Sequence, residues 1–140
     1  GYTGTTIQYQ NPCPAATRVS DTFGERTHPT TLKVLKHDGI DLAAENGTAV
    51  LAAADGVVIQ TGFDYTSGHY VVLYHEVSGE YTYYCHCAEI LVSKGEKVNV
   101  GDKIATVGST GLATGPHLHF ALSRDGEYIE PVFAGLEEYE

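Results

Sequence analysis

Five residues of this chain have the types and spacing of a metal-dependent hydrolase. His37 and Asp41 stand four positions apart in the segment KHDGID, and His117 and His119 stand two apart in GPHLHF. Zinc takes nitrogen and oxygen ligands from separate pieces of chain, and a catalytic zinc keeps one position open. We expect His37, Asp41 and His119 to bind the metal. His86 and His117 would then remain beside it as the free imidazoles of a hydrolase.

The strands expected around these histidines strengthen the interpretation of the pattern as a metal site. Alternation along a strand points His117 and His119 to one face, while Leu118 and Phe120 point into the core. A lone His-x-His pair is more often structural than functional. Here each half of the pattern is flanked by glycines and apolar residues that would hold it against a sheet, and the combination therefore favours a metal site.

Short apolar runs separated by turn signals predict a mainly antiparallel, all-β domain. Asp-Gly and Ser-Gly pairs are typical of hairpin turns. The expected strands are 48–54, 57–61, 69–76, 80–87, 103–108 and 117–123, followed by a last hairpin to 128–129. We also expect one helical turn at 88–92 and a short terminal helix at 131–138.

The length of 140 residues fits one domain. Residues 1–17 are rich in Thr, Gln, Pro and Gly without periodicity, so we expect an N-terminal arm or linker there, which could dock on the domain. Residues 18–140 would form the domain itself.

The net charge of −10 describes an acidic, well-solvated surface. Such a surface disfavours nucleic acid as a partner, because nucleic acid requires a basic face. It also disfavours tight adhesion to an anionic cell wall. We see no signal peptide in this chain and no apolar run long enough to insert in a membrane.

Three cysteines leave the redox state open. Cys85 and Cys87 flank His86 on an expected strand, so alternation would point both to the packed side. Their Cα atoms would be roughly 6.6 Å apart, near the upper end of disulfide geometry. Cys13 could reach one of them, or all three thiols could be free. No Cys-x-x-Cys spacing indicates a zinc site built on cysteine.

Several segments together resemble the lysostaphin/LytM-type zinc metallopeptidases, a family that cuts peptide bonds in bacterial peptidoglycan. The matching segments are FGERTHP at 23–29, HDGIDLA at 37–43, GTAV at 47–50, DGVV at 55–58, YCH at 84–86, VGSTG at 107–111 and TGPHLHF at 114–120. The resemblance covers about residues 18–135. The last two segments are its most specific part.

The resemblance implies a β fold whose long loops wall a groove. It also implies one Zn²⁺ per chain bound by His37, Asp41 and His119, with His86 and His117 as the catalytic histidines. A water activated by zinc would attack the scissile carbonyl while the two histidines assist. Tyr84, beside His86, and His28, on the entry loop, would contact the substrate. The sequence does not divide the roles of the two catalytic histidines.

The implied function is a zinc-dependent endopeptidase acting on cross-links or stem peptides of peptidoglycan. It would work outside the cell, in the bacterial envelope or with a phage, helped by another wall-targeting module or partner. One alternative is a non-catalytic member that binds wall peptide or regulates a partner; the intact set of five residues disfavours it. Another is a lipoyl-type carrier suggested by residues 95–108, which the absence of any methionine disfavours.

Overall fold

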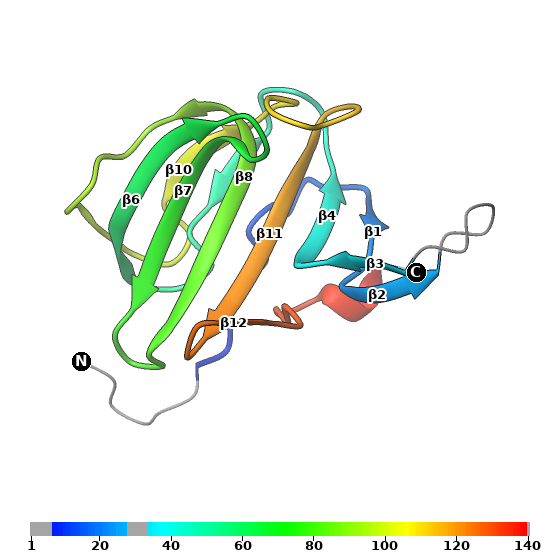
Figure 1. Cartoon of the computed structure of the whole chain (residues 1–140). Coiled ribbons are helices and arrows are strands. Elements are labelled where there is room, and N and C mark those ends of the chain that lie inside the picture. Colours follow the sequence, from blue (N-terminus) through cyan, green and yellow to red (C-terminus); the bar gives the residue numbers. More distant parts are fainter. Residues whose placement is uncertain (1–6, 28–33, 140) are drawn as a thin grey trace.

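The expected antiparallel β fold is confirmed, since nearly all regular structure lies in one sheet that curls around an apolar core (Figure 1). The computed structural model describes residues 7–27 and 34–139. The strands are β1 Arg18–Asp21, β2 Gly24–Thr27, β3 Val34–His37, β4 Gly39–Ala43, β5 Ala49–Leu51, β6 Gly56–Asp64, β7 Gly68–His75, β8 Glu80–Ile90, β9 Lys97–Val98, β10 Lys103–Val107, β11 His117–Arg124 and β12 Glu127–Ile129.

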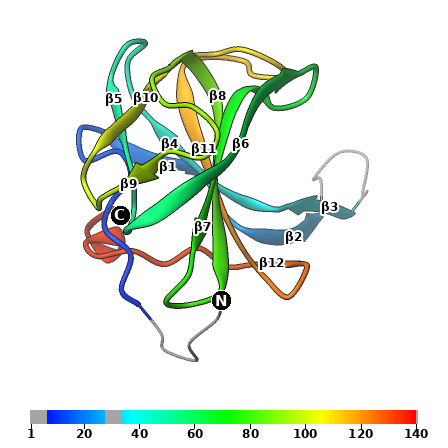
Figure 2. The ribbon, with the colours of Figure 1, turned by 90° about the vertical axis from the view of Figure 1, so that its left-hand side faces the viewer.

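The large sheet runs in the order β1-β4-β11-β8-β7-β6-β9, and β12 pairs with β11. β8 is the longest strand, and its far end leaves β7 and β11 to pair with β10, which also pairs with β5. The sheet therefore curls back on itself. Strands β2 and β3 form a separate hairpin beside it (Figure 2).

The core lies between the layers of the curled sheet. Leu118 and Phe120 on β11 are fully buried, as the alternation predicts, and Leu42, Leu73 and Ile104 meet them from other strands. Because these side chains point inward, the residues that alternate with them face outward. That outward side of β11 carries His117 and His119.

The described part of the N-terminal stretch, residues 7–17, packs on the sheet. Gln10 N donates to Ala53 O, and Leu51 N donates to Pro12 O, both at 2.8 Å. Tyr9 and Cys13 are buried in the same core as the strands. This stretch lies against the domain, which is the docked form of the expected arm.

Two expected helical segments are corrected. Residues 88–90 do not form a helical turn but continue β8, where Ile90 pairs with Ala105 on β10. The backbone groups at this end of β8 find sheet partners, and these outweigh a local turn. At the C-terminus only Leu136–Glu138 forms a 3₁₀ turn, after Gly135 at φ 88°. Within the described residues, no helix is long and apolar enough to cross a membrane.

A β-bulge at His86 changes the faces expected around it. Between the pairs Val71–Tyr84 and His69–Cys87, β8 has one residue more than β7. His86 takes φ 65°, and its N–H donates to Ser67 O at 2.7 Å. The expectation that Cys85 and Cys87 face the same packed side is therefore wrong. Cys87 is in the core cluster, whereas Cys85 pairs with His119, which faces outward.

Candidate metal centre and active site

Neighbouring strands bring the expected metal ligands together. Asp41 on β4 is the cross-strand partner of His119 on β11, and His37 ends β3 just before β4 begins. Gly39 makes this approach possible, because a Cβ at its position would collide with the carbonyl oxygen of Phe120. The glycine thus serves the pairing of β4 with β11, which sets Asp41 beside His119.

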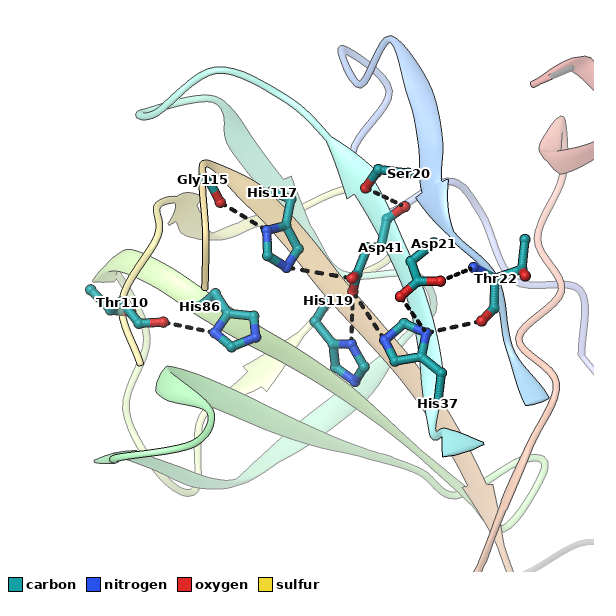
Figure 3. Close-up of polar contacts among 10 residues, drawn as sticks. All are labelled: Ser20, Asp21, Thr22, His37, Asp41, His86, Thr110, Gly115, His117 and His119. Carbon is teal, nitrogen blue, oxygen red and sulfur yellow. Dashed lines mark hydrogen bonds and ion pairs between the residues drawn. The ribbon is translucent and has the colours of Figure 1, made fainter. Parts of the chain in front are cut away.

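One nitrogen or oxygen atom from each of these three residues lies within 4.8 Å of the others. His119 Nδ1 is 2.9 Å from Asp41 Oδ1, and His37 Nε2 is 3.4 Å from the same oxygen. Figure 3 shows both rings turned toward the carboxylate. Two imidazole nitrogens and one carboxylate oxygen are the donor set of many catalytic zinc sites, so these residues fit that ion.

The other two histidines border this cluster, each with one ring nitrogen occupied. His86 Nδ1 donates to Thr110 O at 2.7 Å, and His117 Nδ1 donates to Gly115 O at 2.9 Å. A carbonyl oxygen only accepts, so both Nδ1 atoms carry the proton. This leaves Nε2 of each neutral ring as a proton acceptor. The two ring centroids are 4.9 Å apart (Figure 3).

Charges within the cluster reinforce its geometry. Burial raises the pKa of the Asp41 carboxyl, but hydrogen bonds from His119 and His37 outweigh burial and hold that pKa well below its usual range. The hydrogen bond to Asp41 in turn raises the pKa of His37. Burial lowers the pKa of His86, so this ring favours the neutral form. The cluster therefore combines an ionised carboxylate with a neutral imidazole.

These side chains open onto a hollow of about 340 Å³. Its lining residues are His37, Asp38, Asp41, Thr66, His86, Leu112, Thr114, His117 and His119. Thr66 belongs to the β6–β7 loop, and Leu112 and Thr114 belong to the loop before β11, so these two loops wall the hollow. Asp38, between β3 and β4, also lines the hollow.

Tyr84 does not line this hollow, and its expected contact with substrate is corrected. Its ring is fully buried against Phe120, with centroids 5.4 Å apart. Its hydroxyl accepts from Ala53 N at 3.1 Å and lies 2.8 Å from Thr82 Oγ1. Simple alternation would have placed Tyr84 and His86 on the same face of β8. The bulge at His86 places them on different faces. His28, the other expected substrate contact, lies outside the described residues.

Three residues that position the histidines were missed from the sequence. Thr22 O accepts from His37 Nδ1 at 3.0 Å, and Thr110 O and Gly115 O accept from His86 and His117. All three act through backbone carbonyls, so their side-chain types gave no signal. The Gly-Ser-Thr-Gly segment around Thr110 was the one indirect sign, because it marks a tightly packed loop.

A second hollow, about 560 Å³, lies between residues 7–9 and residues 129–137. This hollow is larger than the one at His37 and His119. Its main ionic feature is the pair between Glu80 and Arg124. In the part of the chain that the structure describes, its lining has no group of metal ligands. Chemistry rather than size thus identifies the hollow at His37 and His119 as the candidate site.

Known proteins resemble this chain in sequence and fold. The sequence profile of peptidase family M23 matches residues 35–131. The peptidoglycan DD-endopeptidase ShyA of Vibrio cholerae is 40% identical over 126 residues, which are 89% of this chain but 29% of that protein. The chain thus spans less than a third of the length of this curated relative.

Solved structures share the fold. A zinc-containing peptidase from Vibrio cholerae superposes with a TM-score of 0.81 at 36% identity, covering 88% of this chain and 39% of the other. The catalytic domain of lysostaphin from Staphylococcus simulans gives 0.72 at 25% identity, covering 82% and 89%. The expected lysostaphin/LytM-type fold is confirmed.

Proposed function

We propose that this chain, which belongs to peptidase family M23, hydrolyses peptide bonds in the cross-links or stem peptides of bacterial peptidoglycan. The observation that carries the proposal is the convergence of His37, Asp41 and His119 on one point, with two further histidines beside them. A protein that only bound wall peptide would not need this set.

We propose that one zinc ion per chain binds at His37 Nε2, the Asp41 carboxylate and His119 Nδ1. When bound, zinc supplies a Lewis acid for the scissile carbonyl and lowers the pKa of a water from 15.7 towards about 7. The protein's part is to hold the three ligand atoms in place. Thr22 O does so for His37 by accepting from Nδ1, which leaves Nε2 turned to the site.

His86 and His117 act on protons and developing charge. In each neutral ring Nε2 can accept a proton, because Nδ1 donates to a backbone carbonyl. One imidazole takes a proton from the attacking water and passes it towards the leaving amine. The other can donate to the oxygen on which negative charge develops only when its Nε2 is also protonated, so in that role the ring would act as an imidazolium. Both rings donate Nδ1 to a carbonyl, and His117 Nε2 in addition lies 3.6 Å from Asp41 Oδ2; the proposal gives both histidines to catalysis without dividing these roles.

The substrate class follows from the relatives. ShyA is named a peptidoglycan DD-endopeptidase, and the chain is 40% identical to it through most of its own length. We therefore propose a wall peptide as substrate and the bacterial envelope or its exterior as the place of action. Delivery by a further wall-targeting module or partner remains a proposal, consistent with the net charge of −10.

The test is mass spectrometry of fragments released from purified cross-linked muropeptides by the zinc-loaded protein. We expect new peptide termini at one type of bond, which disappear when a chelator removes the metal. Peptidoglycans with different cross-links, supplied in parallel, identify the bond. Intact muropeptides from every source after prolonged incubation would contradict the proposal.

A further inference from the structure

Four tyrosines lie together on the outer face of the sheet: Tyr74 on β7, Tyr81 and Tyr83 on β8, and Tyr128 on β12. The ring centroids of Tyr74 and Tyr81 are 4.9 Å apart, and those of Tyr83 and Tyr128 are 5.3 Å apart. Tyr128 is 43% exposed, and the other three are half-buried. We call these four residues the tyrosine face.

The tyrosine face continues the surface that holds the candidate metal centre. His119 and Ser123 lie four positions apart on β11, so both point outward. Ser123 pairs with Tyr81 on one side and with Tyr128 on the other, and its Oγ is 2.8 Å from the Tyr83 hydroxyl. Figure 1 shows β7, β8, β11 and β12 side by side. Four residues of strand span roughly 13 Å, which separates His119 from the row of Ser123, Tyr81 and Tyr128; Tyr83, opposite Ala121, lies nearer.

Cross-strand tyrosine pairs stabilise a sheet by about 0.2–1 kcal/mol each, and that role alone requires no ligand. The residues around these tyrosines indicate a binding role as well. Two rows of outward residues cross β11, β8, β7 and β6 here without a charged side chain, in a chain of net charge −10. These residues are Tyr128, Ser123, Tyr81, Tyr74 and Val57 in one row, and Ala121, Tyr83, Val72 and Gln60 in the other. Charges border them: Lys97 on β9 pairs with Val57, and the charge of Asp38 acts on Tyr128. Aromatic residues that gather at a surface, one of them exposed and three half-buried, are typical of binding surfaces.

We propose that the tyrosine face binds the glycan of the substrate, a chain of β-linked N-acetyl amino sugars, while the attached peptide lies in the hollow at His119. The proposal rests on the proposed action on wall peptides. The apolar C–H face of a sugar ring packs on the negative face of an aromatic ring, and tyrosine hydroxyls can bond the sugar's polar groups. Rings of uncharged amino sugars match the two rows between Tyr128 and Gln60, which themselves carry no charged side chain.

The spacing also suits this substrate. An extended peptide of about four residues spans roughly 13–14 Å. A stem peptide of this length joins the sugar to the cross-link, and the same span separates His119 from Ser123. With the scissile bond at the metal centre, the sugar would therefore lie over the tyrosine face. A second copy of this chain would have no such relation to the metal centre.

Peptide-free glycan fragments of β-1,4-linked N-acetyl amino sugars test the proposal, with binding followed by two-dimensional NMR. We expect the wild type to bind them with shifts centred on the tyrosine face. Tyr81→Ala and Tyr128→Ala should weaken binding by about tenfold or more, whereas Tyr81→Phe and Tyr128→Phe keep the rings and should keep most of the affinity. Thermal unfolding of each variant confirms that it folds, and the largely exposed Tyr128 is the position least able to disturb the core.

The proposal is overturned if the wild type does not bind the fragments, or if the alanine variants bind them as the wild type does. It is also overturned if those substitutions only dissociate a dimer, as sedimentation would reveal. Hydrolysis of a sugar-free cross-linked peptide by the wild type is measured in parallel. Cleavage of the peptide without any glycan binding overturns the proposal that the tyrosine face binds glycan, and leaves the proposed peptidase activity intact. If the wild type binds glycan, the alanine variants do not, and the wild type cleaves no peptide, glycan binding by the tyrosine face is supported. The proposed peptidase activity is then overturned.

Discussion

Asp41 is the residue on which the arrangement of the site depends. Its Oδ1 lies 2.9 Å from His119 Nδ1 and 3.4 Å from His37 Nε2, and its Oδ2 lies 3.6 Å from His117 Nε2. One carboxylate thus touches three imidazoles from two segments of chain. Because its pKa is held well below the usual range, it stays ionised wherever the protein is folded near neutral pH.

Removing either free imidazole should lower the rate without removing the site. For His86→Ala and for His117→Ala we expect kcat to fall by about 10²–10⁴-fold, the usual size of a lost acid–base group. KM should change far less, because neither ring is proposed to bind the substrate in its ground state. Steady-state kinetics on a cross-linked peptide measures both constants, and a kcat near that of the wild type in either variant would remove that histidine from catalysis.

The sequence identified these five residues because their types and spacing were informative together. Glycine and apolar neighbours indicated that KHDGID and GPHLHF pack against a sheet, and strand periodicity then gave the faces of His117 and His119 correctly. The strands β3 and β4 that carry His37 and Asp41 were not among those predicted. The same periodicity misplaced Tyr84, since the bulge at His86 adds a residue that no glycine or proline announces. Contacts made by backbone carbonyls, such as Thr110 O, leave no pattern in side-chain types.

At the scale of elements, the loop after β10 holds β8 in its bulged form. Thr110 Oγ1 donates to Cys87 O at 2.7 Å and accepts from His69 N at 3.1 Å, while Thr110 O accepts from His86. Gly68 permits this contact, because a Cβ there would collide with Thr110 Oγ1. The hydroxyl therefore bridges β7 and β8 at the point where the ring of His86 is oriented.

Loss of that hydroxyl should misplace His86. We expect Thr110→Val to lower kcat by about ten- to a hundredfold with KM nearly unchanged, because small displacements of a catalytic group are costly. Thr110→Ser retains the hydroxyl and should restore most of the rate.

Thr106→Val is the matched control for this prediction. It removes a buried hydroxyl that accepts from Glu89 N at 3.1 Å, a loss of about 1 kcal/mol in stability without a contact to His86. If Thr110→Val and Thr106→Val lower kcat equally, the effect of Thr110 is one of stability and the positioning role is wrong.

Elements whose ends depend on distant partners were the ones that the sequence placed badly. Residues 88–90 were expected to be helical, yet they extend β8 because β10, about fifteen residues further on, offers backbone partners. The hairpins between β6, β7 and β8 were predicted well, since their turns and strands are local in sequence. Nothing in residues 7–17 indicated which part of the sheet they would cover.

At the scale of the whole molecule, a buried polar chain joins the N-terminal stretch to the core. His75 is fully buried: Nδ1 donates to Asp55 O at 2.8 Å, and Nε2 accepts from Thr82 Oγ1 at 2.7 Å. Thr82 Oγ1 is in turn 2.8 Å from the Tyr84 hydroxyl, and the Tyr9 ring lies edge-on to His75. In the neutral imidazole both ring nitrogens thus have a hydrogen-bond partner.

This arrangement predicts acid sensitivity of the fold. Burial lowers the pKa of His75 below its ordinary 6.5, while the unfolded chain keeps the ordinary value. Below about pH 6.5 the unfolded state binds the additional proton, so the free energy of unfolding should fall with pH, by at most about 1.4 kcal/mol per unit from this group. His86 adds a change of the same sign, and His37, with its raised pKa, opposes it.

Urea unfolding of the chelator-treated protein at pH 7, 6 and 5 measures this dependence. His75→Gln cannot titrate, so its free energy of unfolding should fall less steeply with pH than that of the wild type, even if it is lower throughout. Asp55 and Glu80, whose negative charges favour the protonated ring, are unchanged in the variant. Equal slopes in the two proteins would show that His75 does not contribute to acid sensitivity.

The central claim is that three residues bind one zinc ion and two others act beside it. Elemental analysis of zinc per chain, on the wild type and five single alanine variants equilibrated with the same buffered concentration of free zinc, tests this most directly. We predict one zinc for the wild type, His86→Ala and His117→Ala, and a large loss for His37→Ala, Asp41→Ala and His119→Ala. Full zinc content in folded His119→Ala, or its loss in His86→Ala or His117→Ala, would contradict the assignment.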